Sequence, residues 1–173
     1  MDVMKKIIVA IMLLAVCVTA FPQTGNGGVP KEKITSLINE FRTYDGFDVV
    51  RMNALGTSAI KALIRMTALA DSDLEVRAAL DMIKGIKKIA VIDYEDCAQD
   101  VKQRFSRKLN RALSSSELLM EAKDGSEVMR MYGVVSDDSA VVRDFVMFSP
   151  DDCALVCLFG SISLDAIMKI ANQ

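Results

Sequence analysis

Histidine, the side chain most often used for proton transfer near neutral pH, is absent from all 173 residues of this chain. Its absence excludes a Ser-His-Asp triad, a Cys-His dyad and a histidine-bound zinc or haem. Acid-base chemistry would have to use carboxylates or lysine. One acidic cluster lies where an apolar run meets a helical one: Asp93, Glu95, Asp96 and Asp100. Asp93 and Asp96 could serve a carboxylate-dependent hydrolase, although carboxylates at that position also suit the positive end of a helix dipole.

Three of the four cysteines lie beyond residue 20: Cys97, Cys153 and Cys157. Cys153 and Cys157 share one apolar run, in which extended chain would separate them by about 13 Å. A disulfide needs Cα atoms within about 7 Å, so these two are predicted to be small core residues. A disulfide from Cys97 to either of them remains geometrically open. With no Cys-x-x-Cys motif and no histidine, the sequence predicts neither a metal site nor a cofactor.

Basic side chains gather on a predicted helix over residues 97–113. Arg104, Arg107, Lys108 and Arg111 recur at helical spacing, opposite an apolar stripe. Arginine pairs readily with carboxylate or phosphate, so this face is the predicted binding site, for an acidic partner or for anionic lipid headgroups. The alternative is a solvated face that keeps a long helix soluble.

The first twenty residues have the pattern of a secretory signal peptide. Lys5 and Lys6 precede an apolar run from Ile7 to Val16, and the segment ends Val18-Thr19-Ala20. The run is too short for a membrane span, and no later apolar segment is long enough for one. We therefore expect cleavage near Ala20 and a mature protein in the periplasm or cell envelope. A lipoprotein would instead use Cys17, but Val16 before it is a poor match to the small residue that lipidation motifs prefer.

Composition predicts a single domain of modest acidity. Residues 21–30 are rich in glycine and polar side chains and indicate a flexible leader, which leaves residues 31–173 for one α+β domain. Loss of residues 1–20 removes two lysines and one aspartate, so the net charge changes from −2 to −3. This charge argues against a nucleic-acid partner.

Hydrophobic periodicity predicts the elements that must hold these side chains. Residues 31–43 have apolar side chains at helical spacing, namely Ile34, Leu37, Ile38 and Phe41. Further helices are predicted over residues 57–69, 72–84 and 97–113, with Asp96 as a candidate N-cap of the last. Phe47–Met52 is a short β-like run. Ile89–Ile92 is apolar throughout, as expected of a strand buried on both faces.

Beyond residue 117 the period changes to two, which is typical of strands. Four are predicted, over residues 118–123, 127–135, 140–148 and 153–159. Asp124-Gly125 is a hairpin signal between the first two, and Gly160 is expected to end the fourth. A final helix over 164–171 follows. These elements predict an α+β fold: a mostly antiparallel sheet with a C-terminal four-strand meander and helices packed on one face.

The C-terminal half resembles a known family. The residues that carry the resemblance are Leu118–Gly125, Val128–Tyr132, Phe145–Phe148, Leu155–Leu158 and Gly160–Ile167. Together they are similar to domain-of-unknown-function family 4252, small exported proteins of Bacteroidetes. The resemblance implies a cell-envelope location and an uncharacterised function. Its motifs are strands and turns, so it implies no active site.

Two functional hypotheses follow. The first is a non-enzymatic binding or regulatory module of the envelope, with an envelope protein or a surface polymer as partner. The second is the hydrolase built around Asp93 and Asp96. The absence of a recognisable catalytic set favours the first, and neither hypothesis fixes an oligomeric state.

We expect the exported protein to begin at Phe21, because the Val-Thr-Ala ending suits signal peptidase cleavage after Ala20. Intact-mass spectrometry of the protein recovered from the envelope fraction tests this. A diacylglyceryl-modified Cys17 as the first residue would contradict it.

Overall fold

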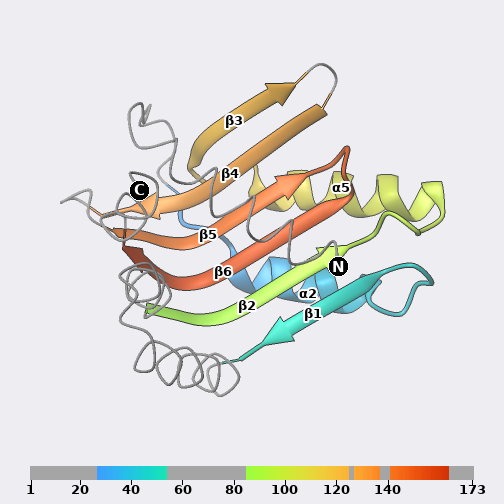
Figure 1. Cartoon of the computed structure of the whole chain (residues 1–173), viewed down its shortest axis with the longest axis horizontal. Helices are drawn as coiled ribbons and strands as arrows, with labels where there is room; N and C mark the ends of the chain where they lie inside the picture. The colour runs from blue at the N-terminus through green and yellow to red at the C-terminus, as the bar shows by residue number, and fades with distance from the viewer. Residues whose placement is uncertain (1–26, 54–84, 125–126, 137–140, 164–173) are drawn as a thin grey trace, which may run out of the picture.

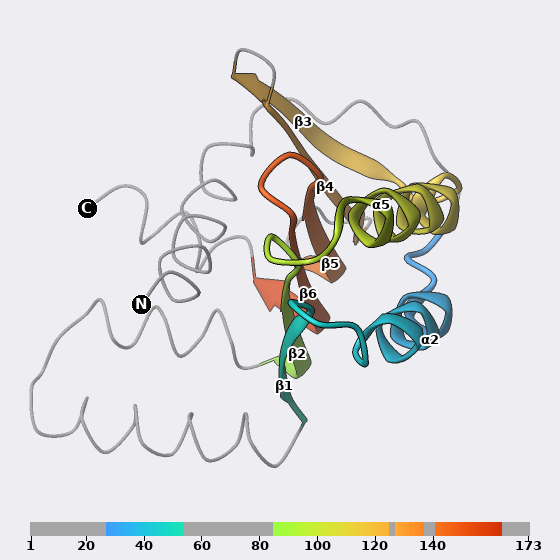
Figure 2. The same ribbon diagram turned by 90° about the vertical axis from the view of Figure 1, so that its right-hand side faces the viewer.

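The computed structural model describes residues 27–53, 85–124, 127–136 and 141–163. Six strands within these residues form one antiparallel sheet in the order β1-β2-β6-β5-β4-β3 (Figure 1). The strands are β1 (Asp48–Met52), β2 (Gly85–Asp93), β3 (Leu118–Asp124), β4 (Glu127–Val135), β5 (Val141–Ser149) and β6 (Ala154–Ser163). Helices α2 (Lys31–Phe41) and α5 (Gln99–Leu113) lie on the same face of the sheet (Figure 2).

This arrangement confirms the predicted fold class. Strands β3 to β6 are the predicted meander, and β2 extends it by pairing with β6. Asp124 of β3 pairs with Glu127 of β4, as expected of a tight hairpin. Residues 125–126 themselves lie outside the described residues. So do the helices predicted over 57–69, 72–84 and 164–171, and the segment expected to be the signal peptide.

Both helices bury the stripes that their sequences predict. The buried residues of α2 are Ile34, Leu37, Ile38 and Phe41, and those of α5 are Val101, Phe105, Leu109 and Leu113. Leu113 ends the buried stripe of α5, whereas the neighbouring Ala112 is only partly buried. Ala98, not Asp96, is the N-cap of α5, and it makes no side-chain capping bond. Burial of apolar stripes therefore positions these helices, because helix stability in proteins comes mostly from such packing.

An aromatic cluster joins the two helices to the end of β2. Phe105 makes edge-to-face contacts with Phe41, Phe47 and Tyr94, with ring centroids 5.2, 5.0 and 4.8 Å apart. The Tyr94 hydroxyl reaches Ser106 Oγ at 3.0 Å, so its polar end is satisfied within α5. Burial raises the pKa of Tyr94 above its usual value, so the phenol stays protonated.

The pairing register shifts once in each of four neighbouring strand pairs, and these shifts form a row across the sheet. The register shifts between Ile86 and Lys88 on β2 and between Arg143 and Phe145 on β5. It shifts again between Tyr132 and Val134 on β4 and between Leu118 and Met120 on β3. The shifts are neighbours: Ile86 pairs with Gly160, and Ser161 pairs with Arg143. Each bulge adds a residue to one strand, which turns side chains beyond it onto the opposite face.

Asp144 and Gly160 form the centre of this row. Asp144 has a left-handed backbone (φ 55°), which aspartate tolerates better than most residues. Its carboxylate accepts a hydrogen bond from the Gly160 amide at 3.0 Å and pairs with Lys31 Nζ at 3.1 Å. The carboxylate thus ties the bulge to the first turn of α2.

Gly160 was expected to end the last strand, and this was wrong because the strand continues through it to Ser163. Its φ is 129°, and a Cβ there would lie 2.3 Å from the carbonyl oxygen of Gly85. Glycine is therefore needed for the close approach of β2 and not for a strand end. Cys153 also lies outside the strand predicted for it, in the preceding turn with a φ of 52°.

We expect Asp144→Ala to lower the free energy of unfolding by about 1–3 kcal/mol, because it strains a left-handed residue and leaves the Gly160 amide unpaired. Asp144→Asn keeps the acceptor and loses only a half-exposed ion pair, so its cost should stay below about 1 kcal/mol. Urea denaturation of the two variants tests this. Equal losses would show that the ion pair to Lys31 dominates.

Candidate functional site

A groove of about 780 Å³ lies between α2 and the strands β2, β6 and β5. Its volume is within the range of about 300–1,000 Å³ that small-molecule sites occupy. It is lined by Lys31, Glu32, Thr35, Ser36, Asn39, Lys87, Lys88, Arg143, Asp144, Phe159, Gly160 and Ser161. We call this the α2 groove.

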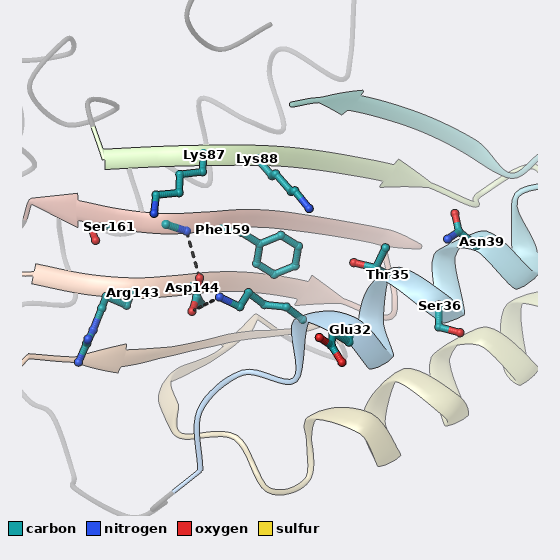
Figure 3. A pocket seen from close by; sticks show the side chains of 12 residues that line it. Glu32, Thr35, Ser36, Asn39, Lys87, Lys88, Arg143, Asp144, Phe159 and Ser161 are labelled. Atoms are coloured by element: carbon teal, nitrogen blue, oxygen red, sulfur yellow. Dashed lines mark hydrogen bonds and ion pairs between the residues drawn. The ribbon is translucent and has the colours of Figure 1, made fainter. Parts of the chain in front are cut away.

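The bulge on β2 places two consecutive lysines in the α2 groove. In a regular strand Lys87 and Lys88 would point to opposite faces. Lys88 is two and four residues before Ala90 and Ile92, so it points to the same face of the strand as these two residues, which belong to the core beneath the helices. The register shift between Ile86 and Lys88 brings Lys87 to that face too. Figure 3 shows both side chains leaving β2 over β6 in diverging directions, Lys88 toward the Phe159 ring and Lys87 toward the end of the groove near Ser161.

The opposite wall is provided by α2 and the Asp144 bulge. Thr35 points into the α2 groove from the helix, and Arg143 lies at the end beside Ser161 (Figure 3). Lys31 is held by Asp144, as described above. Within the described part of the chain, Lys87, Lys88 and Arg143 make no ion pair or side-chain hydrogen bond and are exposed. Three cationic groups are thus free to meet an anion.

A second groove of about 420 Å³ continues along the same helix. It shares Thr35 and Lys88 with the first and extends past Ile38 toward Met52 and Asn53. Arg51 lies here and donates a hydrogen bond to Asn39 Oδ1 at 2.8 Å, which joins β1 to α2. The polar side of α2 therefore faces one continuous depression above the sheet.

The basic residues predicted as a binding site on α5 divide into two pairs. Arg104 donates to the Tyr44 hydroxyl at 2.6 Å and stacks over the Tyr44 and Phe41 rings. Lys108 forms an ion pair with Glu40 of α2. These two residues hold α5 against α2 and the turn after it.

Arg107 and Arg111 are exposed, and their side chains make no hydrogen bond or ion pair among the described residues. Only these two of the four predicted residues are therefore available for a partner. Ligand binding by the basic face of α5 stays a prediction.

The acidic pair of the hydrolase hypothesis lies at the far end of β2. Asp93 is partly exposed, and its Oδ1 accepts a hydrogen bond from the Glu95 amide at 3.1 Å. Asp96 is exposed and precedes α5. Neither residue lines the two grooves along α2. Asp93 is the last residue of β2, and Asp96 lies in the turn between β2 and α5.

The cysteines of the described residues lie in the interior of the protein. Cys97, Cys153 and Cys157 are all buried free thiols. Burial raises the pKa of the Cys157 thiol to about 12 and also raises the pKa of Cys97, so both are protonated and poor nucleophiles at neutral pH. Within the described residues, no three histidine, cysteine or acidic side chains form a group that could hold a metal ion.

The family model for Domain of unknown function (DUF4252) matches residues 41–170. The chain belongs to this family. Comparison with curated proteins and with solved structures gave no match. The matched region of this DUF4252 protein contains the groove residues of β2, β5 and β6 but only the last residue of α2. No helix in the described ranges has the length and apolarity to cross a membrane.

Sequence reasoning missed the α2 groove, although one signal was present. Lys87 and Lys88 interrupt an otherwise apolar run, so one of them would face the core if the strand were regular. A bulge resolves this conflict. The contribution of Arg143 and Asp144 had no comparable signal, because their meeting with β2 depends on long-range pairing through β6.

We expect stability to fall as the pH rises from about 9 toward 12. The Cys157 thiol has an ordinary pKa of 9.0, so the unfolded chain loses its proton there, whereas the folded chain keeps it until about 12. The unfolded state then binds fewer protons, and rising pH favours it. Urea denaturation at several pH values measures the slope. Cys157→Ala should be less stable near neutral pH but should lose less stability across this window. An identical slope in both proteins would contradict the assignment to Cys157.

Proposed function

We propose that this protein is an exported, non-enzymatic binding module of the cell envelope and that the α2 groove holds its ligand. Export is supported by the pattern of Lys5, Lys6, the apolar run and Ala20. The single observation that carries the binding proposal is the bulge that turns both Lys87 and Lys88 into the α2 groove. Two exposed ammonium groups in one groove favour an acidic ligand.

The side chains of the α2 groove suit binding better than hydrolysis. A carboxylate mechanism needs two carboxyl groups that can exchange protons with a substrate. Both oxygens of Asp144 are already engaged, one by the Gly160 amide and one by Lys31. Glu32 is then the remaining carboxylate of the lining. The hydroxyl groups present have no histidine to activate them, since the chain contains none.

The alternative binding surface is the exposed pair Arg107 and Arg111 on α5. It carries the same charge as Lys87 and Lys88 but stands on a convex helix, outside the two grooves along α2. A concave site surrounds more of a ligand and places more polar groups against it. We therefore assign the ligand to the α2 groove and keep the α5 pair as a matched control.

The test is sedimentation of the mature protein, residues 21–173, with envelope fragments of the cells that express it. We expect the wild type to pellet and Lys87→Gln/Lys88→Gln to remain mostly in the supernatant. Arg107→Gln/Arg111→Gln removes the same charge elsewhere and should pellet like the wild type. All four residues are exposed, so both variants should keep the wild-type melting temperature.

Two outcomes would overturn the proposal. Loss of binding in the α5 variant alone would move the site to α5. A wild-type protein that does not pellet with envelopes would remove the envelope ligand altogether.

A further inference from the structure

We propose that the α2 groove binds a phosphate monoester on a polyol, such as a phosphorylated sugar unit of a surface polymer of the envelope, for which a free sugar phosphate is a soluble probe. This inference rests on the proposed function, because it assumes that the α2 groove is the ligand site. It adds the chemical class of the ligand, which the charge and the hydrogen-bonding groups of the groove lining indicate.

The charge of the α2 groove matches one phosphate group. Four cationic side chains line it, Lys31, Lys87, Lys88 and Arg143, against two carboxylates, Glu32 and Asp144, which leaves a net charge of +2. A phosphate monoester carries about −1.5 to −2 at neutral pH. The whole chain has a net charge of −2, so this local excess of positive charge runs against the composition.

Two of the free cations, Lys87 and Lys88, are consecutive residues of β2 and line the same groove. Lys88 extends toward Phe159 and Lys87 toward the end near Ser161 (Figure 3). Lysine ammonium groups are mobile point charges with three donors each, which suits the several oxygens of a phosphate. Lys31 stands across the α2 groove but is held by Asp144. The two β2 lysines are therefore the phosphate contacts that we assign.

The rest of the lining suits hydroxyl groups better than further anions. Thr35, Ser36 and Asn39 line the α2 groove from the helix, and Ser161 lines it from β6. These side chains both donate and accept hydrogen bonds, as the hydroxyls of a polyol do. Glu32 would repel a second anionic group but can accept from a hydroxyl. This combination disfavours a polyanion and favours a single phosphate on a neutral polyol.

The experiment is isothermal titration of the mature protein with glucose 6-phosphate, inorganic phosphate and glucose at low ionic strength. We expect glucose 6-phosphate to bind, inorganic phosphate to bind more weakly, and glucose to give no detectable heat. Lys87→Gln/Lys88→Gln should weaken glucose 6-phosphate binding at least about tenfold, since it removes charge-assisted hydrogen bonds. Arg107→Gln/Arg111→Gln should change it less than about twofold, because those charges lie on another element.

A second variant tests the polyol contact separately. Thr35→Val keeps the side-chain shape and removes its hydroxyl. It should weaken glucose 6-phosphate binding and leave inorganic phosphate binding unchanged. An equal loss for both ligands would place Thr35 against the phosphate and contradict the assignment of the polyol to α2.

Two results would overturn the inference. One is an absence of binding by either phosphate compound. The other is binding to phosphatidylcholine vesicles that contain phosphatidic acid with none to glucose 6-phosphate, which would indicate a lipid surface. If the lysine variant still loses envelope sedimentation in these cases, the α2 groove remains the binding site and only its ligand class is wrong. If that variant also sediments normally, the proposed function fails too.

Discussion

The carboxylate of Asp144 is the contact on which the described structure depends most. It accepts a hydrogen bond from the Gly160 amide inside the sheet and pairs with Lys31 at the start of α2, so one side chain joins the bulge to the helix. The hydrogen bond from the Gly160 amide contributes more to folding stability than the ion pair does. The Lys31 side chain is about half exposed, and a surface ion pair contributes little. Gly160 is its necessary companion, since any side chain there would collide with β2.

The same row of bulges shapes the α2 groove. Without the shift on β2, Lys87 would leave the helix-facing side of the sheet and the positive charge of the α2 groove would fall. Without the shift on β5, Asp144 would not oppose the Gly160 amide. Bulges commonly redirect side chains near functional sites, and here three neighbouring strands contribute to one depression. The bulges of the sheet therefore also form the candidate site.

The contrast between α5 and the α2 groove shows how packing decides which charges are available. Arg104 and Lys108 cover aromatic rings and pair with groups of α2 and its following turn. Their long apolar stems make them useful as packing residues, a role that sequence spacing alone does not distinguish from binding. Lys87 and Lys88 make no ion pair within the described ranges and remain exposed. A count of basic residues on a helix therefore does not distinguish the engaged side chains, Arg104 and Lys108, from the exposed ones, Arg107 and Arg111.

Local patterns in the sequence determined the element types. Ile34, Leu37, Ile38 and Phe41 specify α2 through their spacing, and the change of period beyond residue 117 specifies the meander. The spacing of apolar residues indicates the element type because side-chain burial repeats every 3.6 residues in helices and every two residues in strands. Tertiary structure alone decided the order of β2 and β6, the bulge at Asp144 and the presence of Lys87 and Arg143 in the lining of one groove. Each depends on pairing between residues distant in the chain, and no local period records which strand will lie beside another.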